Sequence, residues 1–164
     1  MQSPTPEDAS KGEFDAVANH ANGPFAPHGA MEVVQRGIVN TGYATGPFNV
    51  EFMNAYRKMW ATQLSSWGGK GAIVVATVFQ NSLVVSLEAL AVFEKIMKAS
   101  GPALPKVSLH IWLIPEDIEG RVLMLPLWKK ATASNGIDVE IFTTEAQFQA
   151  RIDEFVATAE QSPP

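Results

Sequence analysis

The sequence predicts one α/β domain built on a mixed sheet of about five strands with four helices, in the order ββαβαβαβα. Two apolar runs, residues 72–79 and 106–114, are rich in β-branched residues and bounded by glycine or proline, as expected of strands covered on both faces. Segments with apolar residues at helical spacing alternate with these runs. At 164 residues, 46% of them hydrophobic, the chain can bury one core of ordinary size.

The first half of the domain is predicted to contain a strand pair and a helix. Residues 31–36 and 38–44 form two short strands that meet at a glycine. A turn follows, and Asn49 at its end is a residue type that caps helices. Residues 50–67 carry aromatic, leucine and methionine side chains at intervals of three and four, which places them on one face of a helix.

The second half alternates helices and strands around the run at residues 106–114. Helices are predicted over residues 86–99 and 118–134, the second with Pro126 at the start of its main part or at a kink. Residues 137–142 alternate apolar and polar side chains, which is typical of a half-solvated edge strand. A capping-box pattern that begins at Thr144 opens the last helix.

The two ends of the chain differ in composition from the rest. Residues 1–27 mix proline, serine and glycine with four carboxylates against one lysine, so we expect a flexible acidic tail in which residues 14–17 could form one short element. The domain itself is predicted over residues 28–160. Residues 161–164 are predicted to be a disordered end.

Composition excludes several classes of function. The chain has no cysteine and only three scattered histidines, so we expect no disulfide, no thiolate nucleophile, no metal site and no cofactor. No nucleophile elbow, phosphate loop or dinucleotide motif occurs, which predicts a protein that is not an enzyme and has no catalytic residue. A net charge of −5 without a basic cluster argues against nucleic acid. Without a long apolar run or a leader, we expect a cytoplasmic protein with no membrane span.

The candidate site is the segment that joins the first apolar run to the next helix. Ser86 stands at the helix start, where its hydroxyl either caps the helix or presents a position for phosphate near the helix dipole. The apolar side chains before it either fill the core or form a patch that binds a partner. The residues predicted to bind a protein partner or a ligand are Phe79, Asn81, Ser82, Leu83, Val84, Val85 and Ser86.

Several stretches, taken with this element order, resemble a known family. They are the turn Thr45-Gly46-Pro47-Phe48-Asn49, the helix start Ser86-Leu87-Glu88-Ala89-Leu90, the passage over residues 114–121 and the ending over residues 136–144. Through them, residues 29–159 resemble the STAS domain, and more closely its SpoIIAA-like branch of small bacterial proteins, which includes anti-sigma-factor antagonists.

The resemblance implies a regulatory domain that binds a protein partner and is switched by phosphorylation of a serine or threonine at the position of Ser86. In the family pattern an acidic residue directly precedes the acceptor, whereas Val85 precedes it here, and no carboxylate lies between Gly71 and Glu88. We therefore expect an interaction module without the usual phosphorylation switch. The alternative is a binder of a small apolar or lipid-like ligand, because SpoIIAA-like domains are similar in outline to half of a Sec14-type domain.

The remaining side chains are assigned to structure. Tyr56, Trp60 and Trp67 are expected in the core rather than around a ligand, and His110 is expected to be a hydrogen-bonded core histidine. A homodimer remains open, because a strand near Met31 or over residues 137–142 would lie at a sheet edge.

Overall fold

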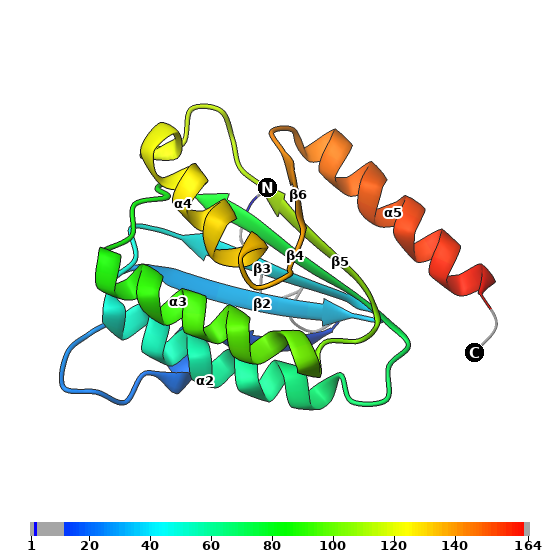
Figure 1. Ribbon diagram of the computed structural model, residues 1–164, viewed down its shortest axis with the longest axis horizontal. Helices are drawn as coiled ribbons and strands as arrows, with labels where there is room; N and C mark the ends of the chain where they lie inside the picture. The colour runs from blue at the N-terminus through cyan, green and yellow to red at the C-terminus, as the bar shows by residue number, and fades with distance from the viewer. Residues whose placement is uncertain (1, 3–11, 163–164) are drawn as a thin grey trace.

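Six strands form one sheet in the order in which they occur along the chain (Figure 1). The structure is a computed structural model that describes residue 2 and residues 12–162. The elements are β1 (Glu13–Ala16), the 3-10 helix η1 (Val17–His20), β2 (Ala30–Arg36), β3 (Val39–Thr45), α2 (Val50–Ser66), β4 (Ala72–Gln80), α3 (Leu87–Ser100), the 3-10 helix η2 (Gly101–Ala103), β5 (Val107–Leu113), α4 (Arg121–Ala133), β6 (Val139–Phe142) and α5 (Glu145–Gln161). The fold is therefore α/β, as predicted, with six strands in place of about five.

The sheet changes from antiparallel to parallel at β3. The first three strands pair antiparallel, and β2 and β3 are joined by a two-residue hairpin in which Gly37 adopts a φ of +60°. From β3 to β6 every pairing is parallel, and each connection contains a helix, as parallel neighbours require. The carboxyl ends of the four parallel strands therefore share one edge of the sheet.

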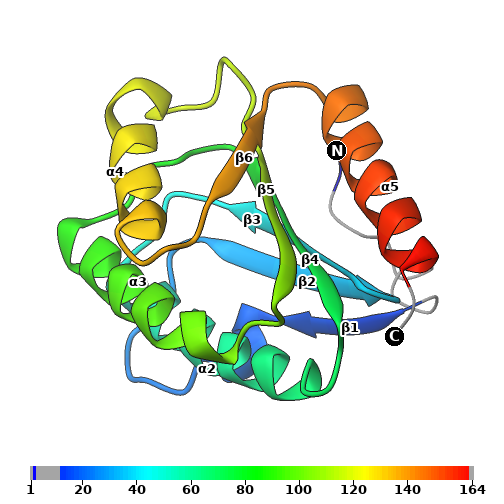
Figure 2. The same ribbon diagram turned by 45° about the vertical axis from the view of Figure 1, so that its right-hand side comes forward.

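Helices cover both faces of the sheet, but unequally. Helices α2, α3 and α4 lie on one face, and α5 lies alone on the other (Figures 1 and 2). Successive side chains of β4 point to opposite faces of the sheet. On one face, Val74, Ala76 and Val78 pack in a cluster with two residues of α5, Phe148 and Ile152. The intervening β4 side chains face the three-helix layer. The continuous apolar runs in the sequence are thus explained by burial on both faces.

Three helix starts are capped as the sequence predicts. Asn49 accepts from the backbone N–H of Phe52 (2.9 Å), and Thr144 accepts from Gln147 N–H (3.5 Å). Ser86 accepts from Ala89 N–H (3.1 Å). The capping interpretation of Ser86 is therefore confirmed.

The amino-terminal boundary differs from the prediction. Residues 13–20, assigned to the tail, contain β1 and η1, and Val17 is 1% exposed within the main core. Asp15 accepts from the backbone N–H of Ala16 (2.8 Å) and lies 2.9 Å from Nε2 of His20. Burial acts to raise the pKa of Asp15, but the hydrogen bonds from His20 and Ala16 outweigh it and hold that pKa below its usual range. Residues 21–27 of the predicted tail are described and contain no helix or strand, and residues 1 and 3–11 lie outside the described residues.

Other boundaries shift by a few residues. Because β1 pairs with β2, the strand that contains Met31 is internal, and the edges of the described sheet are β1 and β6. Helix α4 begins at Arg121, after Gly120 with a φ of +76°, and Pro126 lies inside it. Gln161, assigned to the disordered end, is the last residue of α5, and residues 163–164 lie outside the described residues. None of the described helices is long and apolar enough to cross a membrane.

Candidate functional site

The loop between β4 and α3 is fixed from two sides by backbone hydrogen bonds. Two neighbouring loops enclose it, the turn before α2 and the segment before α4. The hydrogen bonds run from Gly46 N–H to Gln80 O (3.2 Å), from Phe48 N–H to Val84 O (2.8 Å), from Leu83 N–H to Glu119 O (2.8 Å), from Asn81 Nδ2–H to Gly46 O (2.7 Å) and from Trp128 Nε1–H to Leu83 O (3.0 Å). The loop is therefore part of the core structure at the carboxyl edge of the parallel strands.

The candidate residues on this loop divide by burial. Phe79, Ser82, Leu83 and Val85 are buried, with exposures of 0–5%. Val84 is half-buried, and Asn81 and Ser86 are exposed. Asn81 holds a φ of +67°, a backbone conformation that asparagine tolerates better than most residues. Most of the apolar side chains before Ser86 therefore fill the core, which is one of the two alternatives that the sequence predicts, and they do not form an accessible patch.

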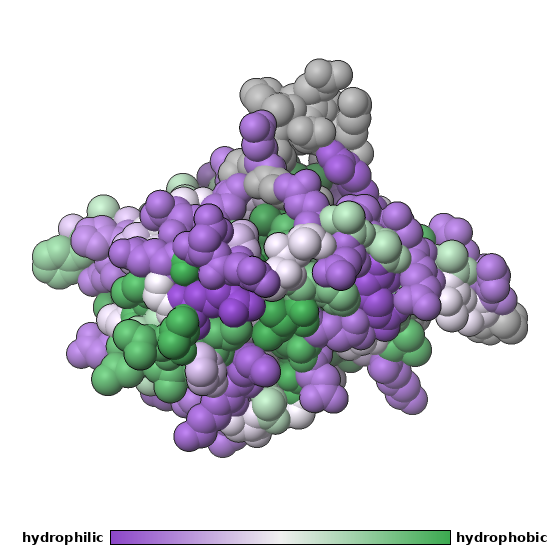
Figure 3. Space-filling view, turned by 90° about the horizontal axis from the view of Figure 1, so that it is seen from above, coloured by the Kyte–Doolittle hydropathy of each residue, from purple (hydrophilic) through white to green (hydrophobic). Residues whose placement is uncertain are grey.

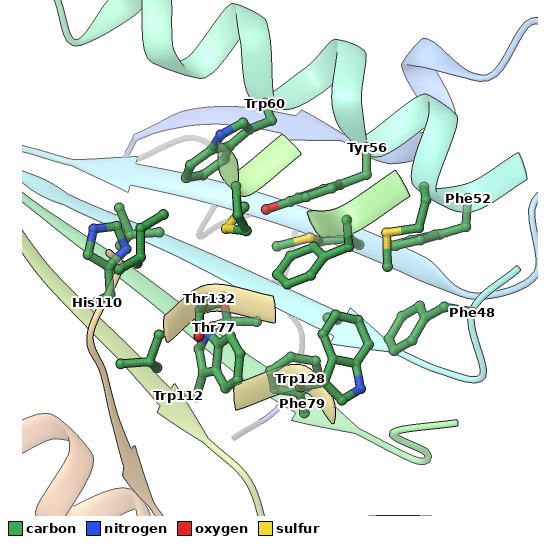
Figure 4. A pocket seen from close by; sticks show the side chains of 18 residues that line it. Phe48, Phe52, Tyr56, Trp60, Thr77, Phe79, His110, Trp112, Trp128 and Thr132 are labelled. Carbon is green, nitrogen blue, oxygen red and sulfur yellow. The ribbon is translucent and has the colours of Figure 1, made fainter. Parts of the chain in front are cut away.

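A partly open cavity lies between the sheet and the three-helix layer (Figure 4). Its volume is about 50 Å³. Aromatic and methionine side chains make most of its wall. Phe79 of β4, which is one of the predicted binding residues, lines it, and so does Tyr56 of α2, which was assigned to the core. It is lined by Met31, Ala44, Phe48, Phe52, Met53, Tyr56, Trp60, Val75, Thr77, Phe79, Phe93, Met97, His110, Trp112, Trp128, Thr132, Ile137 and Val139.

The aromatic rings of this wall contact one another in a continuous series. Phe79 packs edge-on against Trp112 and Trp128, with centroid separations of 5.6 and 5.7 Å. Trp128 also meets Phe93 at 4.9 Å. Tyr56 stacks on Trp60 at 6.0 Å. Such ring pairs favour offset and edge-to-face geometry, so these contacts stabilise the wall on the side of α4 and the carboxyl ends of the strands.

Strand register brings three polar side chains to the same cavity. In the parallel pairing of β4 with β5, Thr77 is opposite Trp112 and Val75 is opposite His110. Alternation along β5 then directs His110 and Trp112 to the same face. Tyr56 completes the set from α2, and its hydroxyl points into the cavity, toward the end where His110 lies (Figure 4).

Burial shifts the pKa values of the two titratable groups of the cavity so that each group favours its neutral form. Desolvation lowers the pKa of His110 to about 4, so its imidazole is neutral at pH 7. Desolvation also raises the pKa of Tyr56, which keeps its phenol protonated. No lysine, arginine, aspartate or glutamate is among the lining residues. The cavity is therefore an uncharged space with several hydrogen-bonding groups.

Metal chemistry has no cluster to support it in the part of the chain that the structure describes. No group of three or more histidine, cysteine, aspartate or glutamate side chains is close enough to hold an ion there.

Comparisons with protein-family models, with curated proteins and with solved structures found no match for this chain.

The cavity was not predicted from the sequence, although two of the aromatic residues that line it were correctly predicted to lie in the core. Tyr56 and Trp60 were expected in the core, where they lie, but they also line a space. Trp67, the third of that set, is fully buried and donates to Gln35 (3.1 Å). His110 was expected to be hydrogen-bonded, but within residues 12–162 no hydrogen bond to its ring is found. The available signal was the presence of threonine and histidine at inward positions of otherwise apolar strands.

Proposed function

We propose that this protein is a non-enzymatic, SpoIIAA-like domain whose function is to bind a small apolar ligand in the cavity between its sheet and α2, α3 and α4. The observation that carries the proposal is the aromatic wall with uncharged polar groups at fixed positions on it. Ligand sites in proteins are commonly of this kind: largely apolar, with a few placed polar groups that orient the ligand.

The order of elements supports the SpoIIAA-like part of the proposal. From β2 onward it runs ββαβαβαβα, the order that underlies the resemblance. Ser86 occupies the start of the helix after the central strand, and its hydroxyl accepts from Ala89 N–H. With Val85 buried beside it and no carboxylate preceding it, the proposed function does not use phosphorylation at this serine. Intact-mass measurement of protein from native cells would contradict this by showing an added phosphate on Ser86.

The size of the cavity restricts the ligand. A volume of about 50 Å³ is below the ~150 Å³ of an engineered apolar cavity that accepts benzene, so a six-membered ring enters only if side chains move. Three methionines line the space, and methionine adapts its shape more readily than branched or aromatic residues. The proposal is therefore a small molecule of about one ring, and a full lipid chain does not fit.

A protein-interaction function is the second candidate, favoured by a different surface. Leu87 at the start of α3 and Val122 and Leu123 at the start of α4 are 75%, 87% and 73% exposed. Apolar atoms gather on the side of the molecule where α4 lies, at the lower left of Figure 3. A partner would be expected to contact these helix starts rather than the loop before α3.

Filling the cavity tests the leading proposal. Val75 of β4 lines the cavity, so Val75→Phe places a ring where the ligand would lie. The matched control is Val107→Phe, because Val107 of β5 is 52% exposed and lies outside the cavity lining. Benzene binding is followed by NMR shifts of cavity-lining residues. We expect saturable binding to wild-type protein and to Val107→Phe, and binding at least about tenfold weaker in Val75→Phe.

Two results would contradict this proposal. One is wild-type protein that shows no saturable shifts at the cavity residues, and the other is Val75→Phe that binds benzene as well as wild type does. If wild-type protein binds no benzene and Val122→Asp removes an interaction with an isolated partner, the protein-interaction function takes its place.

A further inference from the structure

We propose that the cavity selects small neutral molecules that carry a hydrogen-bonding group, of which phenol is the simplest probe, and that Tyr56, Thr77, His110 and Trp112 bind that group. This inference rests on the proposed function, since it specifies the ligand of the same cavity. It concerns the chemistry of the ligand, whereas the proposed function requires only that something apolar is bound.

The indole N–H of Trp112 differs from those of the other three tryptophans. Three of the four tryptophans donate to an acceptor of the protein: Trp60 to Ser100 Oγ (2.6 Å), Trp67 to Gln35 Oε1 (3.1 Å) and Trp128 to Leu83 O (3.0 Å). Trp112, 6% exposed and on the cavity wall, has no acceptor among residues 12–162. Its surroundings offer an acceptor only if a molecule in the cavity supplies one.

Of the three hydroxyl side chains that line the cavity, Thr132 donates to Lys129 O (3.0 Å), whereas the other two have no partner within residues 12–162. Tyr56 and Thr77 line the space, and neither hydroxyl makes a hydrogen bond to the described part of the chain. They are also absent from the fully enclosed polar atoms that lack a partner, among which the described residues contribute Arg121 Nε alone. Both hydroxyl oxygens are therefore accessible rather than enclosed, and both side chains line the cavity. Buried polar groups in proteins are nearly always hydrogen-bonded to protein, water or ligand.

These groups come from separate elements and converge on one space. Thr77 and Trp112 are register partners on neighbouring strands, and His110 lies two residues before Trp112 on the same face. Tyr56 approaches from α2, on the opposite wall (Figure 4). Together they offer an indole donor, two hydroxyl groups that can donate or accept a hydrogen bond, and a neutral imidazole with one donor nitrogen and one acceptor nitrogen. A single hydroxyl, amide or carbonyl on the ligand can be satisfied by such a set.

The charge of the cavity excludes ionised ligands. No lysine or arginine lines it to neutralise a carboxylate, and no carboxylate lines it to neutralise an amine. An ion transferred into such a space loses its hydration without gaining a counter-charge, which is far more costly than transferring a neutral hydroxyl that finds partners. Benzoate, close in shape to phenol, is therefore a suitable probe for exclusion.

The cavity borders a surface cleft at the end where His110 lies. His110 and Ile137 line the cavity and also line a surface cleft at the amino ends of β5 and β6, beneath η2. Ile137 is buried, whereas His110 is only half-buried. Because the same two side chains separate the interior from the surface, we assign them as the boundary through which a small molecule passes.

The test compares benzene, phenol and benzoate on three proteins: wild type, Tyr56→Phe and Tyr43→Phe. Tyr56→Phe removes the cavity hydroxyl and keeps the ring. Tyr43→Phe is the matched control, because Tyr43 packs with the core cluster of α5 on the other face of the sheet. Binding is measured by NMR shifts of cavity residues and by tryptophan fluorescence, and thermal unfolding verifies that each variant is folded.

We expect wild-type protein and Tyr43→Phe to bind phenol about tenfold more tightly than benzene, and benzoate at least about a hundredfold more weakly than phenol. In Tyr56→Phe the preference for phenol falls severalfold, while benzene affinity is unchanged. Thr77→Val, which replaces a hydroxyl by a methyl group, provides a second variant with the same expected outcome.

The inference is overturned if wild-type protein binds benzene more tightly than phenol, if benzoate binds as well as phenol, or if neither Tyr56→Phe nor Thr77→Val reduces the preference for phenol. In each of these cases benzene binding that is lost in Val75→Phe would leave the proposed function intact. If neither benzene nor phenol binds, the proposed function fails together with this inference.

Discussion

His110 shows how one half-buried residue makes the stability of this fold depend on pH. Its pKa is lowered by burial to about 4 in the folded protein, against about 6.5 in an unfolded chain. Between these values the unfolded state binds more protons than the folded state, so stability is complete above pH 6.5 and declines as pH falls toward 4.

The size of this contribution can be measured with His110→Asn. At 1.36 kcal/mol per unit of pKa difference, protonation of His110 removes up to about 3 kcal/mol from the free energy of unfolding by pH 4. Denaturant unfolding of wild type and of His110→Asn at pH 4, 5.5 and 7 should show a steeper decline for wild type. Parallel declines of the two proteins would show that His110 does not titrate in this way.

Ser86 gives a second prediction at the scale of the residue. Because its hydroxyl caps α3, Ser86→Ala should reduce the free energy of unfolding by about 1 kcal/mol, and Ser86→Asp should stay close to wild type, since aspartate also caps helices well. Urea unfolding of the three proteins measures both changes. Equal stability of the alanine variant and wild type would contradict the capping role.

Local chemistry explains which residues could be interpreted from the sequence. The caps at Asn49, Ser86 and Thr144 depend on a side chain and a backbone group two or three residues away, so the sequence contains what is needed to predict them. The roles of Tyr56 and His110 depend on which face of the sheet meets which helix. That information arises from pairing between distant segments and could not be obtained from local patterns.

At the scale of the element, the loop before α3 depends on a close approach of two backbones. A Cβ at Gly46 would collide with the carbonyl oxygen of Ser82, so Gly46→Ala must displace the loop that Gly46 and Phe48 hold by hydrogen bonds. We expect it to reduce the free energy of unfolding by about 1–3 kcal/mol, as overpacking does. Gly71→Ala is the control, because a Cβ there meets no atom within 4 Å. Equal stability of the two variants would contradict this account.

The same loop shows why the sequence alone did not decide whether its apolar side chains fill the core or form a surface for a partner. Leu83, Val84 and Val85 have no periodic pattern and lie in a connection, and connections usually run over the surface. Here the turn before α2 and the segment before α4 cover them, through contacts with residues far away in the sequence. The strand β1 was missed for a related reason: its four residues are partly exposed, and only pairing with β2 defines them as a strand.

At the scale of the whole molecule, the two faces of the sheet have different packing. The face covered by α5 packs as a smaller cluster with Phe148 and Ile152 at its centre. The face covered by three helices carries the larger cluster and, inside it, the cavity. Function is proposed for the larger face because the cavity with the aromatic wall and the uncharged polar groups lies there.

The consecutive order of the strands bears on how the chain reaches this structure. Each strand pairs with the strand made immediately before it, so every new strand meets an edge that is already present. Domains tend to form from the amino terminus during synthesis, and this sheet can grow in one direction with no strand inserted between two others. The cavity would then close late, when β5 delivers His110 and Trp112 and α4 covers them, so an unfinished chain already has most of the binding wall but cannot yet enclose a ligand.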